Sequence, residues 1–322
     1  FDKFESYLKS LRVNPVKEGS KISLVPFTEE QVRKMSSGKL KKPNLAVLGK
    51  DLSPESGGIF DPAVTGGLTG TRWSHIELAE PLPNPVFQEA IQKVLDIDKT
   101  EFRDLLSGKK EVHGKRGGEA IEEMLKRVDV SAERKQLEEH AKRLKSGARS
   151  KVHKRLRIFK MLEDNEIKPT IYMMRSIPVI PPKFRPPVVQ DDGSLSNTDL
   201  NYLYRDLGLM NVTMEEGKKA GAAAFALADD RLALYDTAAA LTGNGPSLTR
   251  EYRGVLDIIS GKTTTRSGKK KGTAKKGFYQ NTLIKRRQAY SDKSIITAEP
   301  AQGLDEVGLP EKIAWGLYAT YV

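Results

Sequence analysis

Apolar residues recur at every third or fourth position through a charged stretch that runs from Ser131 to Glu166. The recurring residues are Leu137, Ala141, Leu144 and Ala148, followed by Val152, Leu156, Phe159 and Leu162. Such spacings align side chains along one face of a helix. With a turn at Ser146–Gly147, the pattern predicts two antiparallel helices whose shared seam serves packing and carries no chemistry.

The same patterning predicts shorter helices and two strands elsewhere. The expected helices cover 28–38, 87–95, 99–107, 118–128, 198–214, 219–241 and a last segment that begins at Pro310. Thr28 is the expected N-cap of the first helix, and Gly38 should lie just past its end. Short strands are expected at 76–78, ended by three prolines, and at 294–297. Together these elements predict an irregular α+β fold with helical hairpins and short strands.

A proline-rich segment, PVIPPKFRPP, separates the first helical pair from the second. Five prolines in ten residues exclude a helix or a central strand and favour an extended course. We therefore expect this stiff segment to present Lys183 and Arg185. The residues DDGS at 191–194 read as a turn.

Positive charge is concentrated late in the chain, which has a formal net charge of +12. Ten lysines and arginines lie between Ser260 and Ser291 with no acidic residue among them, which leaves the rest of the chain near balance. A concentrated patch is the pattern expected of a protein that binds a polyanion. For a Lys/Gly/Ser/Thr run taken alone, a solvated, flexible basic loop is the commoner explanation.

Several classes of site are excluded or unsupported. The chain has no cysteine, which excludes disulfides, thiolate catalysis and cysteine-ligated zinc. The four histidines lack metal-binding spacing, and no apolar run reaches the ~20 residues of a membrane span. The SGKT at 260–263 lacks the earlier glycine of a phosphate-binding loop. No motif in this chain supports catalysis by the chain alone.

Several segments, in order, resemble the N-terminal part of the largest (beta-prime) subunit of bacterial-type multisubunit RNA polymerase. The most specific is PVIPPKFRPPVVQDDGSLSNTDLNYLYRDL at 178–207, which is similar to the family's proline-rich segment, lid loop and first clamp helix. GFYQNTLIKRRQAYSDKSIITAEP at 277–300 resembles the switch segment, and VGLPEKIAWGLY at 307–318 resembles the helix after it. Weaker echoes, such as GGIFDP and HIELAEP, extend the resemblance over roughly 22–322.

The resemblance implies roles for individual residues. In the family the switch segment follows the DNA template toward the active centre, and Arg287 and Lys293 match its two basic positions. The implied template and hybrid contacts are Lys276, Gln280, Lys285, Arg286, Arg287 and Lys293. The lid and proline-rich segment would contribute Lys183, Arg185, Asp192 and Ser194. Phosphate contacts read no sequence, which suits an enzyme that transcribes any template.

The resemblance also implies partners and a cofactor. The expected partners are the DNA template, the RNA transcript, a beta-like subunit, the remaining part of beta-prime and a promoter-specificity factor, with no membrane. Mg²⁺ is expected in the assembled enzyme but not on this chain, because the family's metal loop, N-A-D-F-D-G-D, does not occur in the sequence. The implied location is the bacterial cytoplasm.

The sequence departs from the family at four places. The zinc element is replaced by AVTGGLTGTRWS, so no zinc is expected. The rudder after TGNG is cut short, a basic insertion spans 263–275, and the clamp-hairpin tip KKAGAAAF is poor in side chains for docking a promoter factor. Such compaction resembles a phage- or plasmid-encoded subunit.

Five segments follow from the resemblance. They are an N-terminal clamp segment without its zinc element (1–75), a helical clamp region (76–177), the proline-rich segment, lid and clamp-helix hairpin (178–245), the short rudder and basic switch segment (246–297) and the start of the catalytic core (298–322). Composition and charge also fit a non-enzymatic basic nucleic-acid-binding structural or regulatory protein, or a phage capsid or packaging protein. The ordered motifs favour the polymerase subunit.

Overall fold

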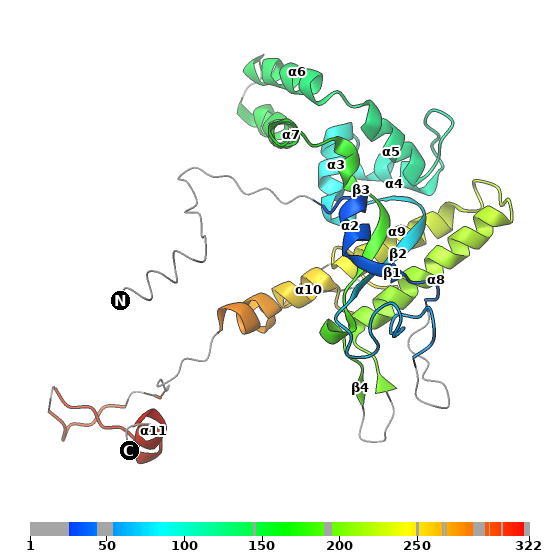
Figure 1. Cartoon of the computed structure of the whole chain (residues 1–322). Coiled ribbons are helices and arrows are strands. Elements are labelled where there is room, and N and C mark those ends of the chain that lie inside the picture. The colour runs from blue at the N-terminus through cyan, green and yellow to red at the C-terminus, as the bar shows by residue number, and fades with distance from the viewer. Residues whose placement is uncertain are drawn as a thin grey trace, which may run out of the picture.

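The structure of the chain, a computed structural model, describes residues 26–43, 54–143, 146–189, 195–248, 251–265, 267, 269–285, 294, 295, 297–303 and 305–318. A three-stranded sheet lies near the centre (Figure 1). Its strands run in the order β1 (Ser36–Lys39), β2 (Trp73–Pro83) and β3 (Met173–Val179), with β1 parallel and β3 antiparallel to β2.

Strand β2 is longer than the sequence predicts. We expected prolines to end it after Leu78, but it continues through Pro81 to Pro83. Two features accommodate the prolines: the register with β3 shifts between Glu77 and Leu82, and β1 pairs only with the start of β2. Prolines are tolerated at such irregularities and beside open edges, where a missing N–H breaks no ladder bond.

The first helices follow from local signals. Thr28 caps α2 (Glu29–Met35) in a reciprocal capping box with Gln31, as predicted, but β1 begins where we expected the helix to run on toward Gly38. Helix α3 (Gln88–Leu95) follows a short 3-10 turn η1 (Pro85–Phe87), and α4 (Lys99–Ser107) has the predicted bounds. Helix α5 (Gly118–Arg127) ends one residue early.

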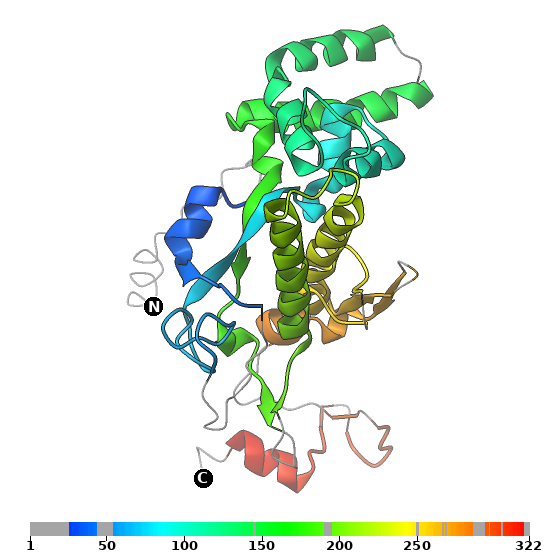
Figure 2. The same ribbon diagram turned by 90° about the vertical axis from the view of Figure 1, so that its right-hand side faces the viewer.

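The predicted helical pair of the charged stretch is confirmed. Helices α6 (Val130–Arg143) and α7 (Ser146–Asp164) lie side by side at one end of the molecule (Figures 1 and 2). Leu137, Leu156, Phe159 and Leu162 are buried along the seam between them and the body. A 3-10 turn, η2 (Pro169–Tyr172), then leads into β3.

The second helical pair, α8 (Asp199–Lys219) and α9 (Ala228–Thr242), packs side by side (Figure 2). The predicted second helix is present, but its predicted start at Lys219 was wrong, because α8 continues to Lys219 and α9 begins at Ala228. The alanine-rich stretch before Ala228 forms the turn of the hairpin, with Gly221 at φ +69°. Alanine has the highest intrinsic helix propensity, but tertiary context overrides propensity here, because the reversal of chain direction needs these residues.

Along the chain, the proline-rich segment and the lid region follow the α6–α7 pair and precede the α8–α9 pair. A 3-10 turn, η3 (Pro182–Phe184), is followed by two short paired strands, β4 (Val188–Val189) and β5 (Leu195–Ser196). The β4–β5 ribbon lies at the end of the molecule opposite the α6–α7 pair (Figures 1 and 2). Residues 191–194, the predicted turn, lie outside the described residues.

The last elements are short. They are α10 (Val255–Ser260), β6 (Lys262–Thr264), β7 (Lys270–Gly272), η4 (Ala274–Lys276), the π-helical turn η5 (Tyr279–Ile284) and α11 (Glu311–Tyr318). The strand expected at 294–297 is not formed by Ser294, Ile295 or Thr297, and Ile296 lies outside the described residues. Ile295 is 88% exposed, so this side chain has no core to enter within the described part of the chain.

One continuous core joins the helices to the sheet. It includes Leu82 of β2, Phe102 of α4, Ile121 of α5, Phe159 of α7 and Leu234 of α9, all fully buried. Helices and small sheets are mixed along the chain, which confirms the predicted α+β class. Of the helices that the structure describes, none is both long and apolar enough to cross a membrane.

Candidate nucleic-acid interface

The basic segment begins at a sharp change of direction after α10. Gly261 ends this helix in the left-handed conformation, at φ +73°. Strands β6 and β7 then pair in antiparallel register, from Lys262 opposite Gly272 to Thr264 opposite Lys270. The lysine run of the expected insertion therefore lies partly in a β-hairpin, which is more ordered than the flexible loop that its glycines suggest.

Three glycines fix where the basic segment leaves the body. A Cβ at Gly261 would lie 2.3 Å from the nitrogen of Gly277, and one at Gly272 would lie 2.5 Å from the carbonyl oxygen of Gly261. Distances under 3.0 Å cannot be met without a backbone shift. Because of this close approach, the base of the β6–β7 hairpin contacts the start of η5. The hairpin and η5, the two parts of the basic segment, therefore project from the same point of the molecule.

We expect Gly261→Ala to loosen this junction. The substitution forces an alanine to positive φ and places its Cβ against the Gly277 backbone, at a cost of about 1–3 kcal/mol. Hydrogen exchange of the amides in β6 and β7 should become faster while the exchange of the core helices is unchanged. Gly316→Ala is the matched control, because nothing lies within 4 Å of its added Cβ. Equal exchange in both variants would contradict the proposed junction.

The three described template candidates lie on or beside η5. Lys276, Gln280 and Lys285 are all exposed, and the amide of Lys285 donates to the carbonyl oxygen of Gln280 at 3.0 Å. Phe278 and Tyr279 on the same turn are 45% and 56% exposed. Single π-helical turns are frequent at functional sites, and exposed aromatic rings among cations suit a nucleic-acid surface.

The cations of this segment have no acidic partners among the described residues. Lys262, Lys269, Lys271, Lys275, Lys276 and Lys285 are exposed, and none of them forms an ion pair in the described part of the chain. Their charge is therefore available to an external anion. Arg286, Arg287 and Lys293, the other predicted template contacts, lie outside the described residues.

Arg185 is not presented to solvent, and that prediction was wrong. Its side chain is fully buried, and its guanidinium donates to the carbonyl oxygen of Ile180 at 2.7 Å, that of Ile59 at 2.7 Å and Oδ1 of Asn201 at 2.9 Å. It also lies over the rings of Phe60 and Tyr204, at 5.0 and 5.6 Å. Burial lowers the pKa of Arg185 to about 10, so the group stays charged at neutral pH.

Arg185 therefore joins three segments that the sequence treats separately. These are the GGIFDP segment through Ile59 and Phe60, the proline-rich segment through Ile180, and helix α8 through Asn201. The side chain of Asn201 returns a hydrogen bond to the carbonyl oxygen of Arg185 at 3.0 Å. Prolines stiffen the backbone, but they do not reveal which side of the segment faces the core.

The other lid candidates have mixed outcomes. Lys183 is exposed as predicted, and its backbone N–H donates to the carbonyl oxygen of Gly70 at 3.0 Å. Asp192 and Ser194 lie outside the described residues. The proline-rich segment thus presents one cation and buries the other.

The loop at the place of the family's zinc element is closed by hydrogen bonds. The carboxylate of Asp61 accepts from the backbone N–H groups of Gly57 at 2.6 Å and Ala63 at 2.8 Å, and the Arg72 guanidinium donates to the carbonyl oxygen of Pro62. In the described ranges no group of three or more histidine, aspartate or glutamate side chains could hold a metal. Absence of zinc remains a prediction.

Two polar contacts that the sequence reading missed fix the α8–α9 pair on the sheet. The side chain of Asn211 bridges β2, accepting from the N–H of Ala79 at 2.8 Å and donating to the carbonyl oxygen of Glu77 at 2.9 Å. Arg231 of α9 forms a buried ion pair with Glu80 of β2 at 3.2 Å. Neither has a spacing signal in the sequence, since 132 residues or more separate the partners.

No protein-family model matches the chain. The DNA-directed RNA polymerase subunit beta' of Thermus thermophilus is 30% identical over 220 residues, which cover 66% of this chain and 14% of the relative. The subunit of the same name from Caldicellulosiruptor saccharolyticus is 26% identical over 370 residues, which cover 94% of this chain. The chain contains a beta-prime-like region.

A third relative, subunit beta' of Acinetobacter baumannii, is 29% identical over 70% of this chain. The beta-prime resemblance of the ordered motifs is thus confirmed by the comparison. The beta-prime-like chain spans 14% of the length of the Thermus relative and 31% of that of the Caldicellulosiruptor relative. The comparison therefore concerns one part of a much longer subunit.

Proposed function

We propose that the chain is the clamp, lid and template-binding part of a DNA-directed RNA polymerase, a nucleotidyltransferase that acts in transcription. The observation that carries the proposal is the similarity to beta-prime subunits over as much as 94% of the chain. The exposed, unpaired cations of the basic segment support it, because a template path needs charge that is free to meet phosphate.

Each structural part then has a role in the assembled enzyme. The basic segment, with Lys276, Gln280 and Lys285 on or beside η5 and Arg286, Arg287 and Lys293 after it, contacts the template strand and the hybrid. The β4–β5 ribbon carries the lid, where RNA separates from the template. The partners are the DNA template, the RNA transcript, a beta-like subunit and the remaining part of beta-prime, in the bacterial cytoplasm.

The α8–α9 pair corresponds to the clamp hairpin. Its turn contains Phe225, which is 84% exposed, among alanines and glycines. One exposed ring is a small surface for a promoter-specificity factor, so docking of such a factor at this turn needs additional contacts elsewhere. Encoding by a phage stays a prediction.

Magnesium ions supply the nucleotidyl-transfer chemistry of such polymerases by stabilising charge on the reacting phosphate. The family's metal loop, N-A-D-F-D-G-D, does not occur in the sequence, so the proposal gives this chain no catalytic residue. Its contribution is to hold nucleic acid and to position the template.

The test compares two variants in the assembled enzyme. Arg287→Ala should slow primer extension about 10- to 100-fold at moderate salt, because a misplaced template strand costs about that much in rate. Changing the Lys269–Lys271 run to alanine should instead weaken DNA binding mainly at low salt, since charges beyond ~10 Å are screened near 0.1 M.

The salt dependence of binding separates close contacts from long-range attraction. Loss of one phosphate contact should lower the slope of log affinity against log salt by about 1, on unrelated DNA sequences alike. If the lysine-run variant stalls extension while Arg287→Ala behaves like the parent, the proposed template path is wrong. If neither variant affects extension but both weaken DNA binding, the chain is a non-enzymatic nucleic-acid-binding protein.

A further inference from the structure

Helices α4 and α9 pack against each other, and two neighbouring pockets lie along their shared edge (Figure 1). The pockets have volumes of about 420 and 460 Å³, and Arg103 of α4 lines both. Each volume lies within the ~300–1,000 Å³ typical of small-molecule sites. We call the two pockets together the α4–α9 groove. None of the residues that line it belongs to the basic segment at 262–293.

Three cations line the first pocket. Lys99, Arg103 and Ser107 follow one another at intervals of four residues, which places them on one face of α4 over about 12 Å of helix. Lys109 lines the same pocket just beyond the C-terminal end of α4. Lys99 and Lys109 are exposed, and neither forms an ion pair in the described part of the chain. Their charge is therefore available to an external anion.

The arrangement of these charges favours an elongated anion. Asp104 is the one acidic residue that lines the first pocket, so the three cations leave a net positive charge there. The cations are spread along the helix and do not converge on one point. A chain of phosphate groups can therefore contact more of them than a compact anion can, and each such contact is charge-assisted.

The second pocket combines a carboxylate with apolar surface. Asp236 of α9 approaches Arg103 at 3.5 Å, and the two side chains remain 36% and 47% exposed. Burial raises the pKa of Asp236, although the charge of Arg103 opposes the shift. The carboxylate therefore has fewer polar partners than in water, and a ligand that donates hydrogen bonds would stabilise it. Pro246 and Leu248 supply the apolar surface.

The loop after α9 holds this apolar surface in place. The hydroxyl of Ser247, which is buried, accepts from the backbone N–H of Tyr252 at 3.2 Å. Pro246 and Leu248 lie on either side of Ser247 and are both exposed. The second pocket is therefore formed without a ligand, as most small-molecule sites are.

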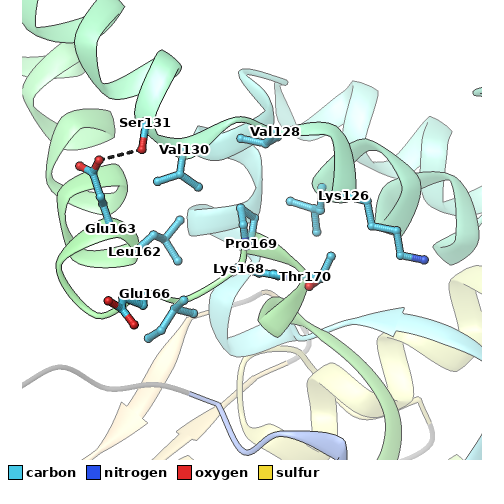
Figure 3. Close-up of a pocket in the computed structure, with 12 residues that line it drawn as sticks. Lys126, Val128, Val130, Ser131, Leu162, Glu163, Glu166, Lys168, Pro169 and Thr170 are labelled. Carbon is cyan, nitrogen blue, oxygen red and sulfur yellow. Dashed lines mark hydrogen bonds between the residues drawn. The ribbon is translucent and has the colours of Figure 1, made fainter.

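A pocket of about 600 Å³ at the base of the α6–α7 pair lacks this division of chemistry (Figure 3). Two lysines and two glutamates line it, so its charges balance. Ser131 donates to the carboxylate of Glu163 at 2.8 Å beside it (Figure 3), and Glu163 also pairs with Arg134. The α4–α9 groove is thus better suited to an anionic ligand than this pocket.

We propose that the α4–α9 groove binds a ribonucleoside triphosphate. The three cations of the first pocket contact its phosphates, and the Asp236 carboxylate accepts from its ribose hydroxyls, as carboxylates do in dinucleotide sites. Pro246 and Leu248 cover the base without reading it, because their side chains have no hydrogen-bonding groups. The proposal does not depend on the polymerase function.

Calorimetric titration of the full chain with nucleotides tests the proposal. The parent should bind ATP and CTP with similar affinity. It should bind dATP about tenfold more weakly, because the hydrogen bond from the 2′-hydroxyl to a charged acceptor is lost. Inorganic triphosphate, which has no ribose, should also bind more weakly than ATP.

Two variants assign the parts of the groove. Lys99→Gln with Lys109→Gln should weaken ATP binding by tenfold or more, because two phosphate contacts are lost. Asp236→Asn should instead reduce the preference for ATP over dATP several-fold, whatever its effect on overall affinity. This ratio separates a contact with ribose from a merely structural role, since lost packing would weaken both nucleotides alike.

The matched control is Lys34→Gln with Lys41→Gln. It removes the same charge from two exposed lysines that form no ion pair in the described part of the chain. This control should bind ATP like the parent. Unchanged circular dichroism of all variants shows that the fold is kept.

Several outcomes would overturn the proposal. They are no binding of ATP by the parent at ~1 mM, which is the range of weak ligands, equal affinity for ATP and dATP, and an equal loss in the control. A random DNA duplex is the last probe. If Lys99→Gln with Lys109→Gln weakens duplex binding and leaves ATP binding unchanged, the groove belongs to a nucleic-acid surface and is not a nucleotide site.

Discussion

Replacing Arg185 with alanine is expected to lower the free energy of unfolding by about 3–5 kcal/mol, measured by urea denaturation. The substitution removes three charge-assisted hydrogen bonds and contacts with two aromatic rings. It also leaves a cavity among buried residues, which adds to the cost. The expected loss is large because the acceptors on Ile59 and Asn201 are buried and would be left without their donor.

Two further variants separate these contributions. Arg185→Met fills much of the cavity but leaves the three oxygens without their donor, so about half of the loss should remain. Lys183→Ala, two residues away on the same segment, removes an exposed cation and should change stability by less than about 0.5 kcal/mol. If Lys183→Ala destabilises the chain as much as Arg185→Ala, the distinction between the buried and the exposed cation is wrong.

Local signals predicted most helices well because the determinants lie within a few residues. Thr28 and Gln31 form their capping box across one turn, and the bounds of α4 follow from Asp98 as N-cap and Gly108 as C-cap. Strand β2 and the start of α9 were mispredicted for the opposite reason. Whether Pro81 can stay in a strand depends on which edge of β2 has a partner, and that partner is distant in sequence.

The candidate site likewise contains features set by nearby residues, which the sequence predicted, and features set by distant residues, which it did not. Exposure of Lys276 and Lys285 follows from a run of cations that no core could bury. The burial of Arg185 could not be predicted, because its acceptors come from Ile59 and Asn201, which are 126 and 16 residues away. The alternation of prolines and cations resembles that of an exposed basic segment, although one of its two cations holds the fold together.

The ion pair between Glu80 and Arg231 is a second contact between residues that lie far apart in the sequence. Side chains of both residues are almost fully buried, at 1% and 7% exposure. Nη1 of Arg231 also donates to the carbonyl oxygen of Ala224, at 3.0 Å, in the turn between α8 and α9. Gly117 leaves the space that the guanidinium occupies, since a Cβ there would lie 2.6 Å from its Nε.

Replacing one partner of this ion pair should therefore lower the free energy of unfolding far more than replacing both partners. We expect Arg231→Met alone to lower the free energy of unfolding by about 3–5 kcal/mol. It leaves the buried Glu80 carboxylate with the partly exposed Lys218, at 3.4 Å, as its remaining ion-pair partner among the described residues. Adding Glu80→Gln to this variant should restore about 1–3 kcal/mol by removing the unpaired charge. Urea denaturation of the four proteins of this cycle measures the coupling, and Lys219→Met, on the exposed side of the same hairpin, is the control for lost surface charge. Additive losses from the two substitutions would mean that the pair does not fasten the hairpin to β2.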